Sequence, residues 1–337
     1  MCEKKIDVLC IGSAVLDIMA NPVGQNRIWA EKQRISSIRI QAGGDALNQS
    51  VHLVDLGVCT ALAACTGSDQ NGRILRNILE ERGVETQYLT VKKEFPTGTA
   101  LVLVDELGER HTFSVFGAHS TLACSDLPVL PEPCRAISLG SLFSMPELEK
   151  EGLVEYLQEA RRKKVLVFAD LASDKLGQGL AGIERFLPYI DYFLPSLYDA
   201  FEMTKTSDVS KAAEQYKNLG VGCVVIKCGS DGCYYMEENN TGMIPAVHVR
   251  PVDTTGAGDC MSALFLSQIL QGESVEAACR FACAGASYST LFPGASTEKL
   301  TKQRKNIKTA FFFTDWGISM KCSLMTLCWS QKNWKSP

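Results

Sequence analysis

The sequence predicts an α/β fold in which helices cover both faces of a mainly parallel sheet, with a small second sheet beside it. Short apolar runs alternate with stretches of helical periodicity along most of the chain, and this alternation is typical of parallel sheets buried on both faces. The segment 97–117 breaks the pattern, because polar and apolar residues alternate there on either side of a turn. The chain has 337 residues, of which 46% are apolar, and this is enough for a large buried core.

Segments in the first half of the chain carry clear strand or helix signals. The apolar run 6–12 ends in glycine, which suits a short buried strand. In 43–57, apolar residues recur at helical spacing and Gly57 marks the end of the helix. The further expected elements are a strand at 59–67, a helix at 72–83 and a hairpin at 97–117 whose turn is DELGE.

The second half alternates more regularly, until the character of the sequence changes near its end. The expected strands are 135–141, 165–170, 223–229 and 233–237, with a further apolar segment at 189–195, and the expected helices include 146–164 and 210–220. Residues 301–337 carry seven basic residues and one acidic residue. We expect a poorly structured basic tail there and assign it no chemistry.

Charge and cysteine content restrict the class of protein. The net charge of −4 gives no general attraction to nucleic acid or to an anionic membrane. The fourteen cysteines are scattered through apolar runs and form no CxxC pair, so we expect reduced thiols in a cytoplasmic protein. Asp7 and Asp17 bracket the first apolar run, which argues against a signal peptide. No apolar stretch approaches the ~18 residues that span a membrane.

The stretch DTTGAGDCMSALFLSQILQG, residues 253–272, joins a polar loop that contains glycine to an apolar helix. Met261, Phe265 and Ile269 are four residues apart, so the helix is expected to be buried and to begin near Gly258. The first turn of a helix has free N–H groups and the positive end of the helix dipole. Where glycines allow close approach, such a turn binds anions.

An anion site and a plain helix cap are the two interpretations of this junction. In the second, Thr255 or Asp259 would only cap the helix. A cap needs one polar side chain, whereas this stretch supplies a glycine pair and two acids, so an anion site is favoured. Asp259 is then placed to accept a proton from an alcohol, while the N–H groups of residues 256–258 neutralise charge on a transferring phosphoryl group.

Other nucleotide and metal motifs do not match. A dinucleotide-binding G-x-G-x-x-G motif fails because Met261 stands where the third glycine belongs, which disfavours a nicotinamide dehydrogenase. The stretch 67–74 has the glycine spacing of a Walker motif, but carries Arg73 and Ile74 in place of lysine and serine or threonine. The four histidines show no ligand spacing, which argues against a structural zinc site.

Four stretches, in this order, resemble the signatures of the PfkB, or ribokinase-like, sugar kinases: GGDALN (43–48), PTGTALVLVDELGERHTF (96–113), VVIKCGSDGCYY (224–235) and VDTTGAGDCMSALF (252–265). The resemblance covers about residues 5–298. It implies a three-layer α/β/α domain over 1–300, with a small β-rich lid from about 13–40 and 97–118. It also implies ATP as the donor, Mg²⁺ and K⁺ as cofactors, a small sugar as the acceptor, and a homodimer formed through the lid.

The resemblance also assigns roles to residues of this sequence. The expected catalytic residues are Asp259 as the base and Gly256, Ala257 and Gly258 as the anion hole. Carboxylates and amides hold neighbouring hydroxyls in a fixed pattern. The expected sugar-binding residues are Asp17, Gly43, Gly44, Asn48, Thr99 and His119. The expected nucleotide-binding residues are Lys227, Gly229, Gly232 and Cys283. Oxygen ligands suit a hard cation. The expected monovalent-cation residues are Asp253, Thr255, Ser289 and Gly294, and Asp199 is expected to act indirectly on magnesium.

Three departures from the family pattern leave the substrate open. The N-x-x-E motif appears as SLYD (196–199), and the stretch 170–175 lacks the usual Asn and Arg. Cys283 stands where an Asn or a His is common. The alternatives are therefore a non-catalytic sugar or nucleotide sensor and a nucleoside kinase on the same fold, although a sensor has no need for the base Asp259. Ribose, fructose, a sugar acid, a sugar phosphate and a nucleoside all remain open as the substrate.

Overall fold

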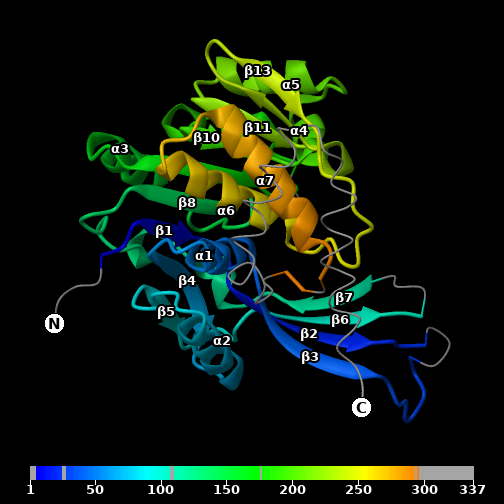
Figure 1. Ribbon diagram of the computed structural model, residues 1–337. Coiled ribbons are helices and arrows are strands. Elements are labelled where there is room, and N and C mark those ends of the chain that lie inside the picture. The colour runs from blue at the N-terminus through cyan, green and yellow to red at the C-terminus, as the bar shows by residue number, and fades with distance from the viewer. Residues whose placement is uncertain (1–4, 25–27, 107–109, 175–176, 293, 296–337) are drawn as a thin grey trace.

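The computed structural model describes residues 5–24, 28–106, 110–174, 177–292 and 294–295, and within them the larger sheet has nine strands (Figure 1). Their order is β13 (Thr241–Ile244), β12 (Cys233–Met236), β11 (Cys223–Lys227), β10 (Tyr192–Phe193), β9 (Leu166–Leu171), β8 (Ala136–Leu142), β1 (Val8–Ile11), β4 (Thr60–Gly67) and β5 (Leu89–Lys92). Neighbours pair in parallel, except that β12 is antiparallel to both β11 and β13. The expected mainly parallel sheet is confirmed.

Helices cover both faces of this sheet and complete three layers. Along β1, Val8 and Cys10 pack into the hydrophobic core on one face, and Leu9 and Ile11 pack into the core on the other. The first face is covered by α1 (Asp45–Asp55), α2 (Gln70–Glu81), α6 (Ala257–Leu270) and α7 (Val275–Ser289). The second face is covered by α3 (Leu153–Arg162), α4 (Leu197–Thr204) and α5 (Val209–Asn218). The three-layer α/β/α fold is therefore confirmed.

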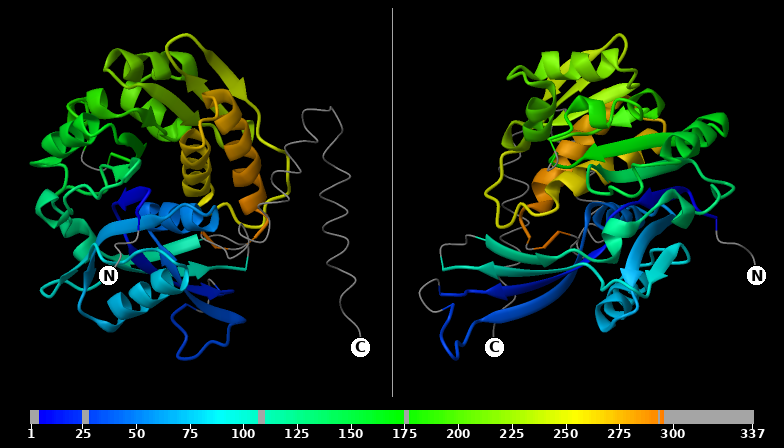
Figure 2. Two further views of the ribbon diagram at one scale, coloured as in Figure 1. Left: turned by 60° about the vertical axis from the view of Figure 1, so that its left-hand side comes forward. Right: turned by 180° about the vertical axis from the view of Figure 1, so that it is seen from behind.

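A smaller four-stranded sheet lies beside the main body of the molecule (Figure 2). Its strand order is β3 (Ser37–Gly43), β2 (Val15–Asn21), β6 (Thr99–Val104) and β7 (Arg110–Val115). The hairpin expected at 97–117 is the pair β6–β7, and β6 lies parallel to β2. Because β2 follows β1 directly and β3 leads into α1, this sheet borders the ends of both elements.

Several expected elements differ in their bounds, and one lies outside the described residues. The helix expected at 146–164 begins only at Leu153. Gly152 is its N-cap residue, and its φ of 82° is outside the range of a right-handed helix, so the helix cannot continue through this residue. The α6 helix begins at Ala257, next to the expected start at Gly258. The basic tail at 301–337 is not among the described residues. Within the part of the chain that is described, no helix is long and apolar enough to cross a membrane.

Candidate active site

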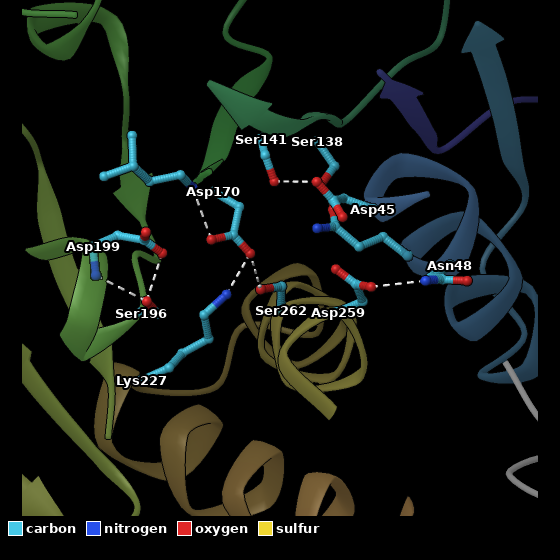
Figure 3. A network of polar contacts seen from close by, with 12 residues as sticks. Asp45, Asn48, Ser138, Ser141, Asp170, Ser196, Asp199, Lys227, Asp259 and Ser262 are labelled. Carbon is cyan, nitrogen blue, oxygen red and sulfur yellow. Dashed lines mark hydrogen bonds and ion pairs between the residues drawn. The ribbon is translucent and has the colours of Figure 1, made fainter. Parts of the chain in front are cut away.

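Polar side chains gather at the carboxyl ends of the parallel strands, where α6 begins (Figure 3). Ser141 comes from β8, Asp170 from β9 and Lys227 from β11. The sheet order brings these strand ends to one edge, and α1 and α6 pack against each other there. In open α/β sheets this edge is where ligands bind.

The N-terminus of α6 is free of side-chain caps. Gly256 is the N-cap residue at φ 72°, and no side chain accepts a hydrogen bond there. The Thr255 hydroxyl instead donates to Asp253 at 2.7 Å, so the structure does not support the plain-cap interpretation. Within the described residues, the N–H groups of Gly256 and Gly258 have no acceptor, whereas Ala257 donates to a backbone carbonyl at 3.2 Å. Two of the three N–H groups expected in the anion hole are thus open to a ligand.

Asp259 lies in the first turn of α6 and is held by one side chain from α1. The amide nitrogen of Asn48 donates to Asp259 Oδ2 at 2.8 Å. Burial, and then the nearby carboxylates of Asp45 and Asp170, raise the pKa of Asp259 well above its usual range; Asn48 and Lys227 oppose this. A carboxylate with a raised pKa is a stronger base, and this suits it to take a proton from an alcohol.

The residues expected at the sugar come together around the start of α1. A Cβ atom on Gly43 would collide with the Asp17 carboxylate, so only glycine leaves room for that side chain. Gly44 has φ 101°, and a Cβ there would lie 2.5 Å from the carbonyl oxygen of Ser13. Asn48 follows one turn later and is buried, and its Oδ1 atom has no partner among the described residues. The amide nitrogen of the same side chain points to Asp259, and Oδ1 lies on its opposite side (Figure 3).

Thr99 and His119 belong to the side of the small sheet. Thr99 pairs with Leu16, the neighbour of Asp17 on β2, and its hydroxyl accepts from Asn71 and donates to a carbonyl, both at 3.0 Å. The His119 ring stacks on Phe116, and burial lowers its pKa. Its Nδ1 atom is buried without a partner among the described residues. The Thr99 hydroxyl therefore already has two hydrogen-bond partners, whereas His119 Nδ1 has none among the described residues.

Three of the residues expected at the nucleotide line one pocket of about 340 Å³. Gly229 and Gly232 form one wall, Cys283 of α7 forms another, and Ala257 lies at the α6 end. Gly232 has φ 102°, and a Cβ there would collide with a neighbouring backbone carbonyl. Lys227 does not line this pocket but lies beside it, with its Nζ atom 3.6 Å from where a Cβ on Gly258 would be.

The structure brings together three of the four residues expected at a monovalent cation. The Asp253 carboxylate accepts from the N–H of Gly294 at 2.9 Å and from the N–H of Thr255 at 2.9 Å. Ser289 is different, because its hydroxyl and its carbonyl are both used in local turns, with Ala286 and Phe292 respectively. Carboxylate oxygens such as those of Asp253 are ligands that hard cations prefer, and a cation at this place stays a prediction.

Asp199, expected near magnesium, lies in the first turn of α4 with two serine partners. Its carboxylate accepts from Ser196 at 2.5 Å and from Ser173 at 3.1 Å. No group of three or more His, Cys, Asp or Glu side chains in the described ranges could hold a metal ion directly. The indirect role of Asp199 at Mg²⁺ stays a prediction.

Comparison with known proteins decides the family. The sequence profile of the pfkB family carbohydrate kinases matches residues 5–302. The chain belongs to this family. Carbohydrate kinases are phosphotransferases with an alcohol group as the acceptor, so the expected enzyme class is confirmed.

Relatives of this carbohydrate kinase include sugar kinases and ribokinases. It is 33% identical over 226 residues to an uncharacterized sugar kinase of Archaeoglobus fulgidus, covering 66% of this chain and 87% of the relative. It is 27% identical over 270 residues to a ribokinase of Haemophilus influenzae, covering 79% and 86%. Its fold is similar to that of a putative ribokinase II from E. coli in complex with ATP and Mg²⁺, with TM-score 0.77 and 21% identity, covering 90% of this chain and 100% of that chain.

Two acidic residues of the kinase's site, Asp45 and Asp170, had no role in the sequence analysis. Asp45 accepts a hydrogen bond from the Ser141 hydroxyl, and the charge of Asp45 raises the pKa of Asp259. Asp170 accepts from Lys227 and, at 3.2 Å, from the Ser262 hydroxyl. The only sequence signals were the acid inside GGDALN and the acid that ends an apolar strand. Neither signal predicts which side chains, distant in the sequence, contact these two acids.

Proposed function

We propose that the protein is an ATP-dependent sugar kinase that transfers the γ-phosphoryl group to a hydroxyl of a small sugar. Family membership makes it a carbohydrate kinase, and one arrangement supports the choice of residues. Asp259 is partly buried, held by Asn48 and placed in the same helical turn as the free N–H groups of Gly256 and Gly258. A base and an anion hole at this spacing can serve one acceptor oxygen and one phosphoryl group.

The reaction needs one proton transfer and one in-line displacement. Asp259 takes the proton of the sugar hydroxyl as that oxygen forms a bond to the γ-phosphorus. The bond from phosphorus to the bridging oxygen breaks, and ADP leaves with the bonding electrons. The N–H groups of Gly256 and Gly258 donate to the phosphoryl oxygens, where negative charge is spread in the transition state.

The proposed acceptor site lies between α1 and the small sheet. Asp17 accepts hydrogen bonds from sugar hydroxyls, and the unpartnered Oδ1 of Asn48 accepts one more. Thr99 of β6 and His119, which follows β7 in the chain, complete the site, and the small sheet acts as a lid. The name of the 33% identical relative, a sugar kinase, supports this substrate class.

The proposed donor site is the pocket bordered by Gly229, Gly232 and Cys283. The similar E. coli structure is a complex with ATP and Mg²⁺, which supports ATP as the donor. Mg²⁺, held through water by Asp199, would neutralise phosphate charge, and K⁺ at Asp253 would steady the loop before α6. A cytoplasmic location remains a prediction.

We also propose a homodimer through the small sheet. Ile40, Ile18, Leu101 and Phe113 are opposite one another on successive strands and form one apolar row. The exposed fractions of Ile40, Leu101 and Phe113 are 52%, 40% and 55%. An apolar row this exposed is typical of a protein interface.

The decisive experiment is a screen of ATP consumption over a panel of sugars, sugar acids, sugar phosphates and nucleosides. Turnover of a sugar supports the proposal, and turnover of nucleosides alone selects the nucleoside kinase. Binding of a sugar or of ATP without any turnover would contradict the proposal and leave the non-catalytic sensor. No observation at Asp259 favours that sensor, since a binding protein gains nothing from a partly buried carboxylate whose pKa is raised.

A further inference from the structure

Lys227 and Asp170 form an ion pair that is almost completely buried. The exposed fractions of their side chains are 12% and 7%. Removing two charges from water costs several kcal/mol per ion, and such a pair often stabilises a fold no more than apolar residues of the same size. Folding alone therefore gives no reason for an ion pair at the carboxyl ends of β9 and β11.

The ammonium group of Lys227 lies at the first turn of α6. Its Nζ atom is 3.6 Å from the position that a Cβ on Gly258 would occupy, and Gly258 is one of the residues with an open N–H group. Figure 3 shows Lys227 reaching from β11 toward Asp170, next to the α6 turn that carries Asp259. An anion bound at Gly258 would meet this ammonium as well as the helix N–H groups.

Asp170 is fixed from three directions. Its Oδ2 atom accepts from Lys227 and from the Ser262 hydroxyl at 3.2 Å, and its Oδ1 atom accepts from the N–H of Leu171 at 2.8 Å. A carboxylate held in this way cannot turn to another partner at low cost. An ammonium group has three N–H donors, and Asp170 uses one of them, so Lys227 has donors left for a ligand.

Resting on the proposed function, we propose that Lys227 is a further catalytic residue, whose ammonium contacts the γ-phosphoryl group during transfer, and that Asp170 and Ser262 position it. The sugar oxygen bonds to phosphorus, the bridging P–O bond breaks, Asp259 receives the hydroxyl proton and ADP leaves. Lys227 forms no covalent bond. It stabilises the negative charge on the phosphoryl oxygens together with the N–H groups of Gly256 and Gly258.

The ion pair also acts on the base, and its two members act in opposite directions. The groups around Asp259 are Asp45 and Asn48 from α1, Asp170 from β9 and Lys227 from β11. The Asp170 charge raises the pKa of Asp259, and the Lys227 charge lowers it. Removing either charge should therefore move the acid limb of the kcat–pH profile, and the two changes should move it in opposite directions.

The first test compares Lys227→Met with Lys150→Met, which removes an exposed lysine paired with Glu147. We expect kcat of Lys227→Met to fall roughly 10²–10³-fold, as on loss of an oxyanion donor, with the acceptor found in the screen. We expect the affinity for a non-hydrolysable ATP analogue, measured by calorimetry, to fall much less. Lys150→Met should keep wild-type kinetics. A Lys227→Met protein that keeps more than a third of kcat, or loses only ATP affinity, would overturn the proposal.

The second test uses the pH dependence of kcat. The acid limb should move to lower pH in Asp170→Asn and to higher pH in Lys227→Met, while Lys227→Arg, which keeps the charge, should recover part of kcat. Shifts in the same direction would overturn the positioning role. Where Lys227→Met does not fold, the double variant with Asp170→Asn removes both buried charges and takes its place in the kcat comparison. Wild-type protein that turns over no acceptor overturns the proposed function instead.

Discussion

Gly256→Ala tests the anion hole by changing the position of a backbone N–H group. Gly272→Ala, at the other end of α6, is its control. Gly256 precedes the helix at φ 72°, and Gly272 follows it at φ 86°. A Cβ atom on Gly272 would meet nothing within 4 Å. A Cβ on Gly256 would lie 2.6 Å from the carbonyl oxygen of Ala295 and 2.7 Å from its Cα. The two substitutions thus share the backbone strain and differ in crowding.

The expected loss of stability follows from these two terms. An alanine held in the left-handed region costs roughly 1–2 kcal/mol, and both variants bear this cost. Gly256→Ala must also displace Ala295, whose carbonyl accepts a hydrogen bond from buried His52 at 3.0 Å. Overpacking a close-packed site adds about 1–3 kcal/mol. We expect the free energy of unfolding to fall by roughly 2–5 kcal/mol for Gly256→Ala and by roughly 1–2 kcal/mol for Gly272→Ala.

Denaturant unfolding and steady-state kinetics together check this prediction. Displacing the Gly256 N–H group by about 1 Å can cost up to roughly 10²-fold in kcat, so Gly256→Ala should lose most turnover under conditions where it is still folded. Gly272→Ala, 14 residues or more from the loop, should keep wild-type kcat. Equal destabilisation of the two variants, with kcat unchanged in both, would refute the crowding argument and the anion hole with it.

Four further outcomes follow from the site. Asp259→Asn should keep ATP binding but lose about 10²–10⁴-fold in kcat. Burial raises the pKa of Asp259 in the folded state, so the ionised carboxylate destabilises the fold. The variant should therefore melt at a higher temperature than wild type at pH 8, and this difference should disappear in acid. Asp17→Ala should weaken sugar binding roughly 10- to 100-fold with ATP affinity nearly intact in calorimetry, and an equal loss of both would contradict its role. Replacing potassium by a bulky organic cation at fixed ionic strength should lower kcat several-fold, and unchanged activity would argue against a cation at Asp253. Phe113→Asp should convert the dimer to monomer in light scattering, whereas Val129→Asp, at an exposed residue away from the small sheet, should not.

The sequence by itself determined the layers of the fold and the chemistry of one loop. Residues 8–11 are apolar at every position, which predicts a strand buried on both faces, and β1 indeed packs into a core on each side. The junction at 253–272 was also readable, because positive φ at glycine and helical periodicity are local properties. Local rules did not place the start of α3, which depends on the conformation of Gly152.

Only the tertiary structure decided which polar side chains meet. Asn48 and Asp259 are 211 residues apart, and Asp170 and Lys227 are 57 apart. The strand order places their elements at one edge of the sheet, and the sequence carries no local signal for that order. The sequence also contains several chemically equivalent hydrogen-bond partners for each polar side chain, so the role of that side chain depends on its burial and on its distance to each partner. That is why the sequence predicted Asp259 as a base and Lys227 as a nucleotide-binding residue, but did not predict that Asp170 pairs with Lys227.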